Sequence, residues 1–159
     1  NDTILGTAGN DVIAGFGGWD TISGLEGDDT ICGGPNSDTL DGGDGKDRIF
    51  GGSKHDTIYG GDGKDALFGE DGNDTIYGEG HHDIIKGGRQ NDVLWGGLGD
   101  DRIKGGPAVD ELYGQKGDDS LWGQRGDDLL HGGSGTDTAD GGPHVNTCVS
   151  IEAPTLCTL

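Results

Sequence analysis

The sequence predicts an all-β solenoid, in which short parallel strands stack in flattened coils of eighteen residues, with turns along both edges. Three observations lead to this fold class. An aspartate occurs at every ninth position, a glycine stands five residues before each one from Asp11 to Asp137, and an aliphatic residue stands two residues after it. The repeat unit is therefore G-x-x-x-x-D-x-(I/L)-x, with glycine at position 1, aspartate at position 6 and Ile or Leu at position 8.

The aspartate series runs through the chain without a gap. Its sixteen members are Asp2, Asp11, Asp20, Asp29, Asp38, Asp47, Asp56, Asp65, Asp74, Asp83, Asp92, Asp101, Asp110, Asp119, Asp128 and Asp137. Position 8 is Ile or Leu from Ile4 to Leu130 and departs only at Ala139. A chain with 37 glycines, 29% hydrophobic residues and a formal charge of −20 would otherwise suggest disorder. A disordered chain needs no such register.

Each nine-residue unit is interpreted as a tight turn over positions 1 to 6, followed by a strand of three residues. Within the strand, the central Ile or Leu points inward and its two neighbours point to solvent. Two units facing each other make one coil, which explains why GGDGKD recurs eighteen residues apart, at 42–47 and 60–65. Stacked coils then join the single inward side chains into continuous apolar ladders.

Stacking also places each aspartate about 5 Å from its equivalent in the next coil, a repulsion of roughly 1 kcal/mol in water and more when the pair is buried. A column of such carboxylates requires cations. Carboxylates and turn carbonyls are hard oxygen donors, which suit Ca²⁺ better than Zn²⁺. The pattern therefore predicts several Ca²⁺ ions bound between coils.

These repeats resemble the RTX (repeats-in-toxin, haemolysin-type) calcium-binding nonapeptide family, whose unit is G-G-x-G-x-D-x-U-x. The resemblance covers residues 1–147 and leaves 148–159 as a C-terminal cap or tail. It implies a right-handed parallel β-roll with calcium held by aspartate side chains and turn carbonyls, so that all sixteen aspartates are ligand candidates. It also implies a protein secreted by bacteria, in which the repeats form a structural module that folds in extracellular calcium.

The two edges of the roll differ at position 4, which is glycine in the family motif. One edge keeps this glycine except in GEGHHD at 78–83, and its sites are expected to bind tightly; their aspartates are Asp11, Asp29, Asp47, Asp65, Asp101, Asp119 and Asp137. The other edge carries Asn36, Lys54, Gln90, Ala108 and His144 at position 4. Its sites at Asp38, Asp56, Asp92 and Asp110 are expected to be weak or empty, whereas Asp20, Asp74 and Asp128 keep the full pattern.

Outward-facing columns give an alternative function, that of an extracellular structural or recognition solenoid such as an adhesin, filament subunit, glycan binder or ice binder. Tyr59, Tyr77, Trp95 and Tyr113 occupy position 9 of successive coils on one face, beside a threonine column from Thr3 to Thr75. Contact with glycan or with a second copy through this aromatic column is one interpretation. Simple cross-strand stabilisation is the other.

The three cysteines are Cys32, Cys148 and Cys157. A disulfide between Cys148 and Cys157 closing the cap is the favoured interpretation, and it agrees with an oxidising, secreted context. Cys32 falls at an outward ninth position, which leaves a free thiol or an intermolecular bridge, and a free thiol is the favoured interpretation. Cysteine is unusual in the RTX resemblance.

No known catalytic motif occurs, so the chain is not expected to be an enzyme. The acidic composition argues against nucleic-acid binding, and no apolar run is long enough for membrane insertion. His81 and His82 could hold a transition metal, but a pair of turn histidines is more often solvated. The start NDTILG lacks a leader segment and begins mid-repeat, which is compatible with a fragment of a longer protein.

Overall fold

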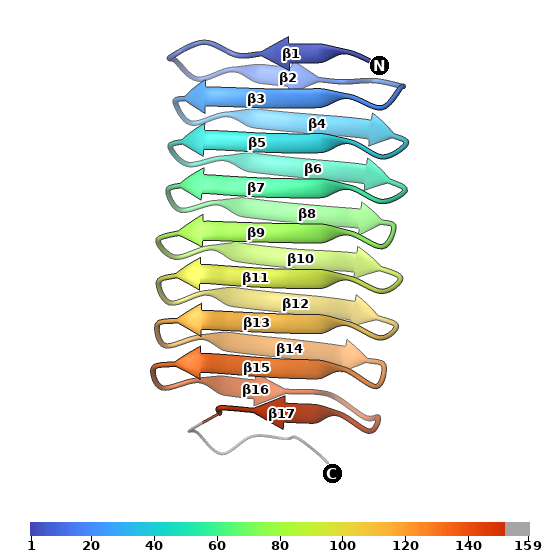
Figure 1. Cartoon of the computed structure of the whole chain (residues 1–159), viewed down its shortest axis with the longest axis vertical. Helices are drawn as coiled ribbons and strands as arrows, with labels where there is room; N and C mark the ends of the chain where they lie inside the picture. The colour runs from blue at the N-terminus through green and yellow to red at the C-terminus, as the bar shows by residue number, and fades with distance from the viewer. Residues whose placement is uncertain (152–159) are drawn as a thin grey trace.

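Seventeen β-strands make up the described part of the chain, residues 1–151 of a computed structural model (Figure 1). The odd-numbered strands are β1 (Thr3–Leu5), β3 (Thr21–Glu26), β5 (Thr39–Asp44), β7 (Thr57–Asp62), β9 (Thr75–Gly80), β11 (Val93–Leu98), β13 (Glu111–Lys116), β15 (Leu129–Ser134) and β17 (Thr147–Val149). The even-numbered strands are β2 (Val12–Ala14), β4 (Thr30–Pro35), β6 (Arg48–Ser53), β8 (Ala66–Asp71), β10 (Ile84–Arg89), β12 (Arg102–Pro107), β14 (Ser120–Arg125) and β16 (Thr138–Asp140).

The odd strands form one parallel sheet of nine strands, the odd sheet, and the even strands form a second parallel sheet of eight, the even sheet. Each strand pairs with the strand one coil away at an offset of eighteen residues; for example, Leu94 lies between Ile76 and Leu112. The chain alternates between the two sheets and winds in a right-handed sense (Figure 1). The predicted fold class, a parallel β-roll with eighteen residues per coil, is confirmed.

The core is a double ladder of the position-8 side chains, as predicted. Fifteen of them, from Ile13 to Ala139, are buried, and those from Ile22 to Leu130 are at most 1% exposed. Strand alternation places positions 6 and 1 on the same inward side as position 8. Aspartate and glycine therefore flank each core side chain, and this placement determines the environment of the aspartates.

The predicted strand length of three residues is wrong for most of the roll. Thirteen strands, β3 to β15, contain six residues each, because pairing continues through positions 1 to 3 of the following unit. Glycine at positions 1 and 2 does not interrupt the ladder, since its backbone N–H and C=O can still pair. The turn itself is confined to positions 4 to 6, which makes each edge of the roll tight.

The described residues contain no helix, and hence none that could cross a membrane. Cys32 is a free, exposed thiol, as expected. Cys148 lies in β17, which pairs with β15 and extends the odd sheet. The predicted Cys148–Cys157 disulfide involves Cys157, which lies outside the described residues, as does most of the predicted cap.

Candidate metal centre

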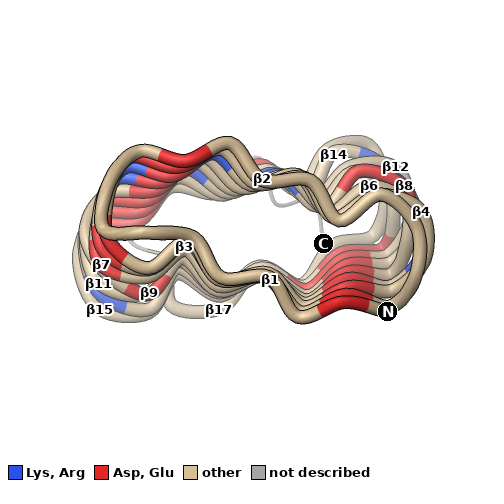
Figure 2. The backbone as a smooth tube through the Cα atoms, turned by 90° about the horizontal axis from the view of Figure 1, so that it is seen from above, with Lys and Arg blue, Asp and Glu red and all other residues tan. Residues whose placement is uncertain are grey.

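Aspartates line both edges of the roll in two columns. The first edge contains the turns that follow odd strands, and the second edge contains the turns that follow even strands. Seen along the roll, acidic residues gather at both edges of the flattened coil (Figure 2). The fourteen aspartates from Asp20 to Asp137 are no more than 3% exposed. Asp2 is exposed and Asp11 is only half-buried, because they belong to the first coil.

One carboxylate oxygen of each buried aspartate joins neighbouring coils. Oδ1 accepts a hydrogen bond of 2.7–2.9 Å from the backbone N–H of the aspartate one coil earlier, from the Asp2–Asp20 pair to the Asp119–Asp137 pair. This bond spans eighteen residues, so it is not the local turn closure that short-range Asx-turns provide. The aspartate side chain thus has a structural role that does not require a metal.

The second oxygen of these carboxylates has no such partner. Oδ2 is buried without a hydrogen-bond partner in all thirteen aspartates of the series from Asp20 to Asp128. It lies against the position-1 glycine of its own unit: a Cβ at Gly42 would be 2.3 Å from Oδ2 of Asp47. Any side chain at position 1 would therefore displace the carboxylate. Buried acceptors in such numbers are rare in proteins and need an explanation.

Asn146 shows what surrounds the orphaned oxygen, because it replaces aspartate at position 6 of the last described unit. Its Oδ1 accepts from the backbone N–H of Asp128 at 2.9 Å, as the aspartates do. Its Nδ2 donates to the carbonyl oxygens of His144 at 3.0 Å and Gly142 at 3.4 Å. In the units from Asp20 to Asp128, a carboxylate oxygen without a hydrogen-bond partner lies against the position-1 glycine, as Nδ2 of Asn146 lies against Gly141. Where such an oxygen meets turn carbonyls, a proton or a cation is needed between the acceptors.

Burial raises the pKa of the aspartates in the middle of the roll. Burial, together with repulsion from neighbouring aspartates of the column, raises the pKa of Asp83 and Asp92 to about 8. The same causes raise the pKa of Asp56 and Asp101 to about 7. The backbone N–H bond to Oδ1 lowers these pKa values but does not offset burial.

The donor set fits a hard cation that accepts backbone ligands. No group of three or more His, Cys, Asp or Glu side chains within residues 1–151 is close enough to hold a metal by itself. A bound ion would therefore combine carboxylates with turn carbonyls, and the carbonyls stack at position 4: a Cβ at Gly45 would lie 1.9 Å from the carbonyl oxygen of Gly27. An all-oxygen set containing backbone carbonyls suits Ca²⁺.

Turn geometry differs between units with and without glycine at position 4. The glycines that have a positive φ there show values of 121–151°, for example Gly45 and Gly126. Asn36, Lys54, Gln90 and, on the first edge, His81 adopt the left-handed region instead, at 71–91°. Ala108 retains a φ of 125°, which is unfavourable for a residue with a Cβ. The turns of Asn36, Lys54, Gln90 and His81 therefore differ in backbone conformation from the glycine turns, whereas Ala108 keeps the angle of a glycine.

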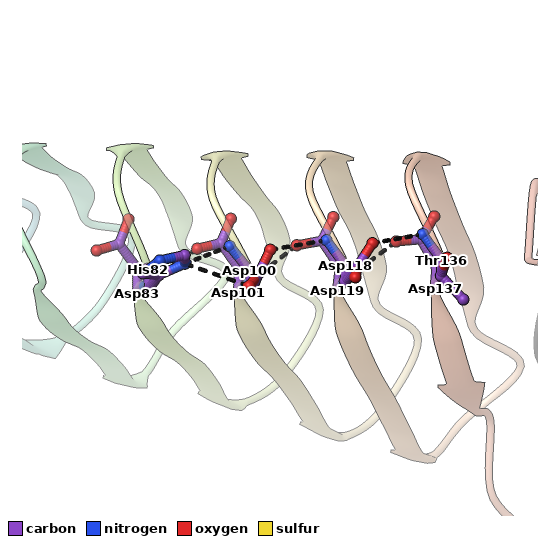
Figure 3. Close-up of polar contacts among 8 residues, drawn as sticks. All are labelled: His82, Asp83, Asp100, Asp101, Asp118, Asp119, Thr136 and Asp137. Carbon is purple, nitrogen blue, oxygen red and sulfur yellow. Dashed lines mark hydrogen bonds and ion pairs between the residues drawn. The ribbon is translucent and has the colours of Figure 1, made fainter.

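Sequence reasoning missed a second column, which is formed by the side chains at position 5. Asp118 donates its backbone N–H to Oδ1 of Asp100 at 3.0 Å, and Thr136 donates to Oδ1 of Asp118 at 2.8 Å (Figure 3). These bonds run from a coil to the side chain of the preceding coil, opposite in direction to the position-6 bonds. The signal was present in the sequence, because most position-5 residues are Asp, Asn, Ser, Thr or His.

The histidine pair does not form a metal site with its neighbours. His82 accepts a hydrogen bond at Nδ1 from the backbone N–H of Asp100 at 2.5 Å, and the same nitrogen lies 3.8 Å from Oδ2 of Asp100. His81 lies 2.9 Å from Oδ1 of Asp62, through Nδ1, and both side chains are mostly exposed.

The aromatic column of the odd sheet is stacked along the roll. Ring centroids are 5.1 Å apart for Tyr59 and Tyr77, 4.7 Å for Tyr77 and Trp95, and 5.6 Å for Trp95 and Tyr113, with interplanar angles of 7–11°. Parallel rings this close overlap face to face, because rings lying side by side in one plane would collide. The inner rings thus present their edges to solvent. This geometry favours cross-strand stabilisation and does not favour a sugar stacking on ring faces.

The fold and its turns define a class of protein: a parallel β-roll whose edges carry columns of buried carboxylates beside backbone carbonyls. The family model for the RTX calcium-binding nonapeptide repeat (4 copies) matches residues 1–31, 23–58, 32–65, 41–76, 77–110 and 104–139. These matches cover most of the chain, and the chain belongs to the RTX calcium-binding nonapeptide repeat family. A search of curated proteins found no match.

Proposed function

We propose that this chain is a calcium-dependent folding module, in which Ca²⁺ ions bound between coils convert a self-repelling acidic chain into a rigid roll. Calcium binding itself is supported by family membership. The observation that carries the rest is the geometry at Asn146, where an amide donor bridges two turn carbonyls at the point where the aspartates place an unpaired oxygen. In the aspartate units, a calcium ion would provide the positive charge that the amide donor of Asn146 provides in the last unit.

The proposed ligands are the sixteen aspartates of the repeat together with turn carbonyls. Because a side chain at position 4 changes the turn, we propose two classes of site. Glycine-containing turns, mainly on the first edge, would bind tightly. The turns containing Asn36, Lys54, Gln90 and Ala108 would bind weakly or remain empty, and so would the turn containing His81.

The proposed setting is extracellular, and the proposed role is structural and not catalytic. Calcium is scarce inside cells and abundant outside, so binding would favour folding after secretion. We assign the repeat module to residues 1–147 and a capping role to 148–159. The outermost described strand, β17, pairs with β15 and covers the last apolar rung, in agreement with such a role.

The test is a calcium titration of chelator-treated protein, followed by far-UV circular dichroism, with calorimetry to count bound ions. We expect a cooperative transition from coil to β structure at or below about millimolar calcium, with Mg²⁺ ineffective because it demands tighter octahedral geometry. A chain that is fully folded in chelator at neutral pH and binds no calcium would overturn the proposal.

A further inference from the structure

The outer face of the even sheet carries a basic track on an otherwise acidic protein. At position 9, Phe68, Lys86, Lys104 and Trp122 follow one another on β8, β10, β12 and β14, and Arg102 lies beside them at position 7 of β12. The outward positions 7 and 9 of the even strands β6 to β14 include no acidic residue, and Glu70 on β8 is the acidic residue at the outward position 2 of these strands. The outward positions of the odd sheet, in contrast, carry no Lys or Arg.

The cations of this basic track have no carboxylate partner within the described chain. None of the ion pairs found in residues 1–151 involves Lys86, Arg102 or Lys104, and all three are exposed. The two lysines diverge onto aromatic rings: Lys86 Nζ lies 5.1 Å from the ring centre of Phe68, and Lys104 Nζ lies 5.3 Å from that of Trp122. The rings hold the two ammonium groups in place and leave them available to anions.

The odd-sheet side of the first edge provides a complementary surface, an acidic groove of about 460 Å³. Asp41, Asp44, Asp62 and Glu79 line it, and the exposed Leu98 closes one end. Asp44 and Asp62 are exposed and are register partners on β5 and β7. Asp62 contacts His81 through one oxygen, and its side chain remains 70% exposed.

The charges of the two surfaces are spaced by the same structural repeat. Lys86 and Lys104 are register partners on adjacent strands, as are Asp44 and Asp62. In both pairs the strands that carry the charges are about 4.8 Å apart, and the two ammonium groups stand further apart because they lean in opposite directions along the roll. Two rolls lying side by side with parallel axes would therefore set a row of cations against a row of carboxylates carried by strands of the same spacing. A ligand without this repeat has no such match.

We propose that the basic track of one molecule docks on the acidic groove of a second copy of this chain, which gives lateral association of rolls. The two surfaces lie on different sides of the molecule, so the contact is heterologous and can extend beyond a dimer. The inference rests in part on the proposed function, because each bound Ca²⁺ would remove two negative charges and weaken the general repulsion between molecules of charge −20. It does not use the aromatic column of the odd sheet.

The test is sedimentation velocity of the full chain in calcium at low ionic strength, over a wide range of protein concentration. Wild type should associate, and about 0.5 M NaCl should dissolve the assemblies by screening. The variants K86E/K104E and D44K/D62K should each lower the association constant at least about tenfold. An equimolar mixture of the two variants should recover association. The matched control R89E/R125E changes the net charge as much as K86E/K104E, at exposed position-3 residues of the second edge, and should behave as wild type.

Circular dichroism and calcium calorimetry on the same samples separate this contact from the calcium proposal. If no calcium binds but the folded chain still associates with this charge dependence, the contact stands and the calcium proposal fails. A folded, calcium-loaded wild type that stays monomeric at every concentration overturns the contact. So does association that both double variants leave unchanged. If wild type is monomeric but binds dextran sulfate through Lys86 and Lys104, the track binds polyanions and the proposal is wrong.

Discussion

The backbone N–H of Asp74 donates a hydrogen bond of 2.8 Å to Oδ1 of Asp92, one coil later, while Oδ2 of Asp92 is buried without a hydrogen-bond partner. One side chain thus links two coils through one oxygen and creates an unmet requirement for positive charge through the other. The first oxygen favours stacking, whereas the second opposes it unless a cation or a proton is present. Because the two oxygens have different roles, substitutions can test the role of each oxygen separately.

Replacing Asp92 by asparagine should make the fold less dependent on calcium. The amide keeps the acceptor for the Asp74 N–H and, as at Asn146, adds a donor toward the turn carbonyls. We expect the metal-free fold to gain about 1–3 kcal/mol, the usual penalty of an unsatisfied buried group. The number of tightly bound calcium ions should stay unchanged, because Asp92 belongs to the turn containing Gln90, one of the proposed weak sites. Circular dichroism in chelator and calorimetry in calcium would measure the two effects.

Two variants serve as controls for Asp92→Asn. Asp92→Ala removes the acceptor for the Asp74 N–H and should destabilise the roll with or without calcium. Asp2→Asn alters an exposed carboxylate of the first coil and should change little. Equal losses of β structure for Asp92→Asn and Asp92→Ala would contradict the separation of roles between the two oxygens.

Acid should replace calcium as a folding trigger. Burial raises the pKa of Asp83 and Asp92 to about 8, well above the value of about 4 in an unfolded chain. The metal-free fold therefore binds more protons than the unfolded chain between these pH values. Its stability is fully present below about pH 4 and is lost as the pH rises toward 8. Circular dichroism in chelator should show β structure at low pH that disappears toward pH 8.

Calcium should have the opposite pH dependence, because its ligands must be deprotonated. Calcium affinity measured by calorimetry should increase between pH 5 and pH 8. A metal-free chain that gains β structure as the pH rises would show that the columns are not protonated in the fold.

The free-energy cost of a Cβ at position 4 should increase with the φ angle of that residue. Ala108→Gly should stabilise the calcium-bound roll by roughly 1 kcal/mol, because φ is 125° there. Lys54→Gly should gain less, since Lys54 already sits near the left-handed region at 87°. Gly45→Ala should be severely destabilising, because its Cβ would lie 1.9 Å from the carbonyl oxygen of Gly27. Thermal unfolding in calcium would rank the three; a neutral Gly45→Ala would refute the steric argument.

The aromatic column should stabilise the roll without binding calcium or sugar. Tyr77→Ala removes the contacts with Tyr59 and Trp95, and we expect a loss of roughly 1–3 kcal/mol from two ring pairs. The number of bound calcium ions should stay the same by calorimetry. Retention of wild type, but not of Tyr77→Ala, on a polysaccharide column would instead support the recognition function.

Much of the fold could be predicted because the same pattern of glycine, aspartate and an aliphatic residue recurs in every nine-residue unit. A nine-residue period with one aliphatic residue leaves few ways to bury Ile58 or Leu94 other than stacking strands. Strand length could not be predicted, because glycine at positions 1 and 2 appeared to end a strand, whereas the parallel ladder continues through Gly60 and Gly61. Sheet pairing between coils overrides the local preference of glycine.

The candidate site could be predicted in its residues but not in its details. Periodicity placed the aspartates in columns, and strand alternation could have shown that position 6 shares the inward side with position 8. The polar residues at position 5 were visible in the sequence, but the direction of their hydrogen bonds and the positive φ at position 2, seen at Leu25 and Gln115, depend on turn geometry that only the stacked structure specifies. Calcium occupancy depends on the ion itself and stays a prediction.

The opposed bonds at positions 5 and 6 have a mechanical consequence. Every coil is fastened to its neighbours by nearly the same set of contacts, and the described contacts are concentrated between successive coils of each sheet. Under tension applied at one end, no interior coil can yield before the outermost one without breaking two sets of these contacts. The roll should therefore unfold one coil at a time from the end that is pulled. Each unfolding step should release eighteen residues, about 60 Å of extended chain.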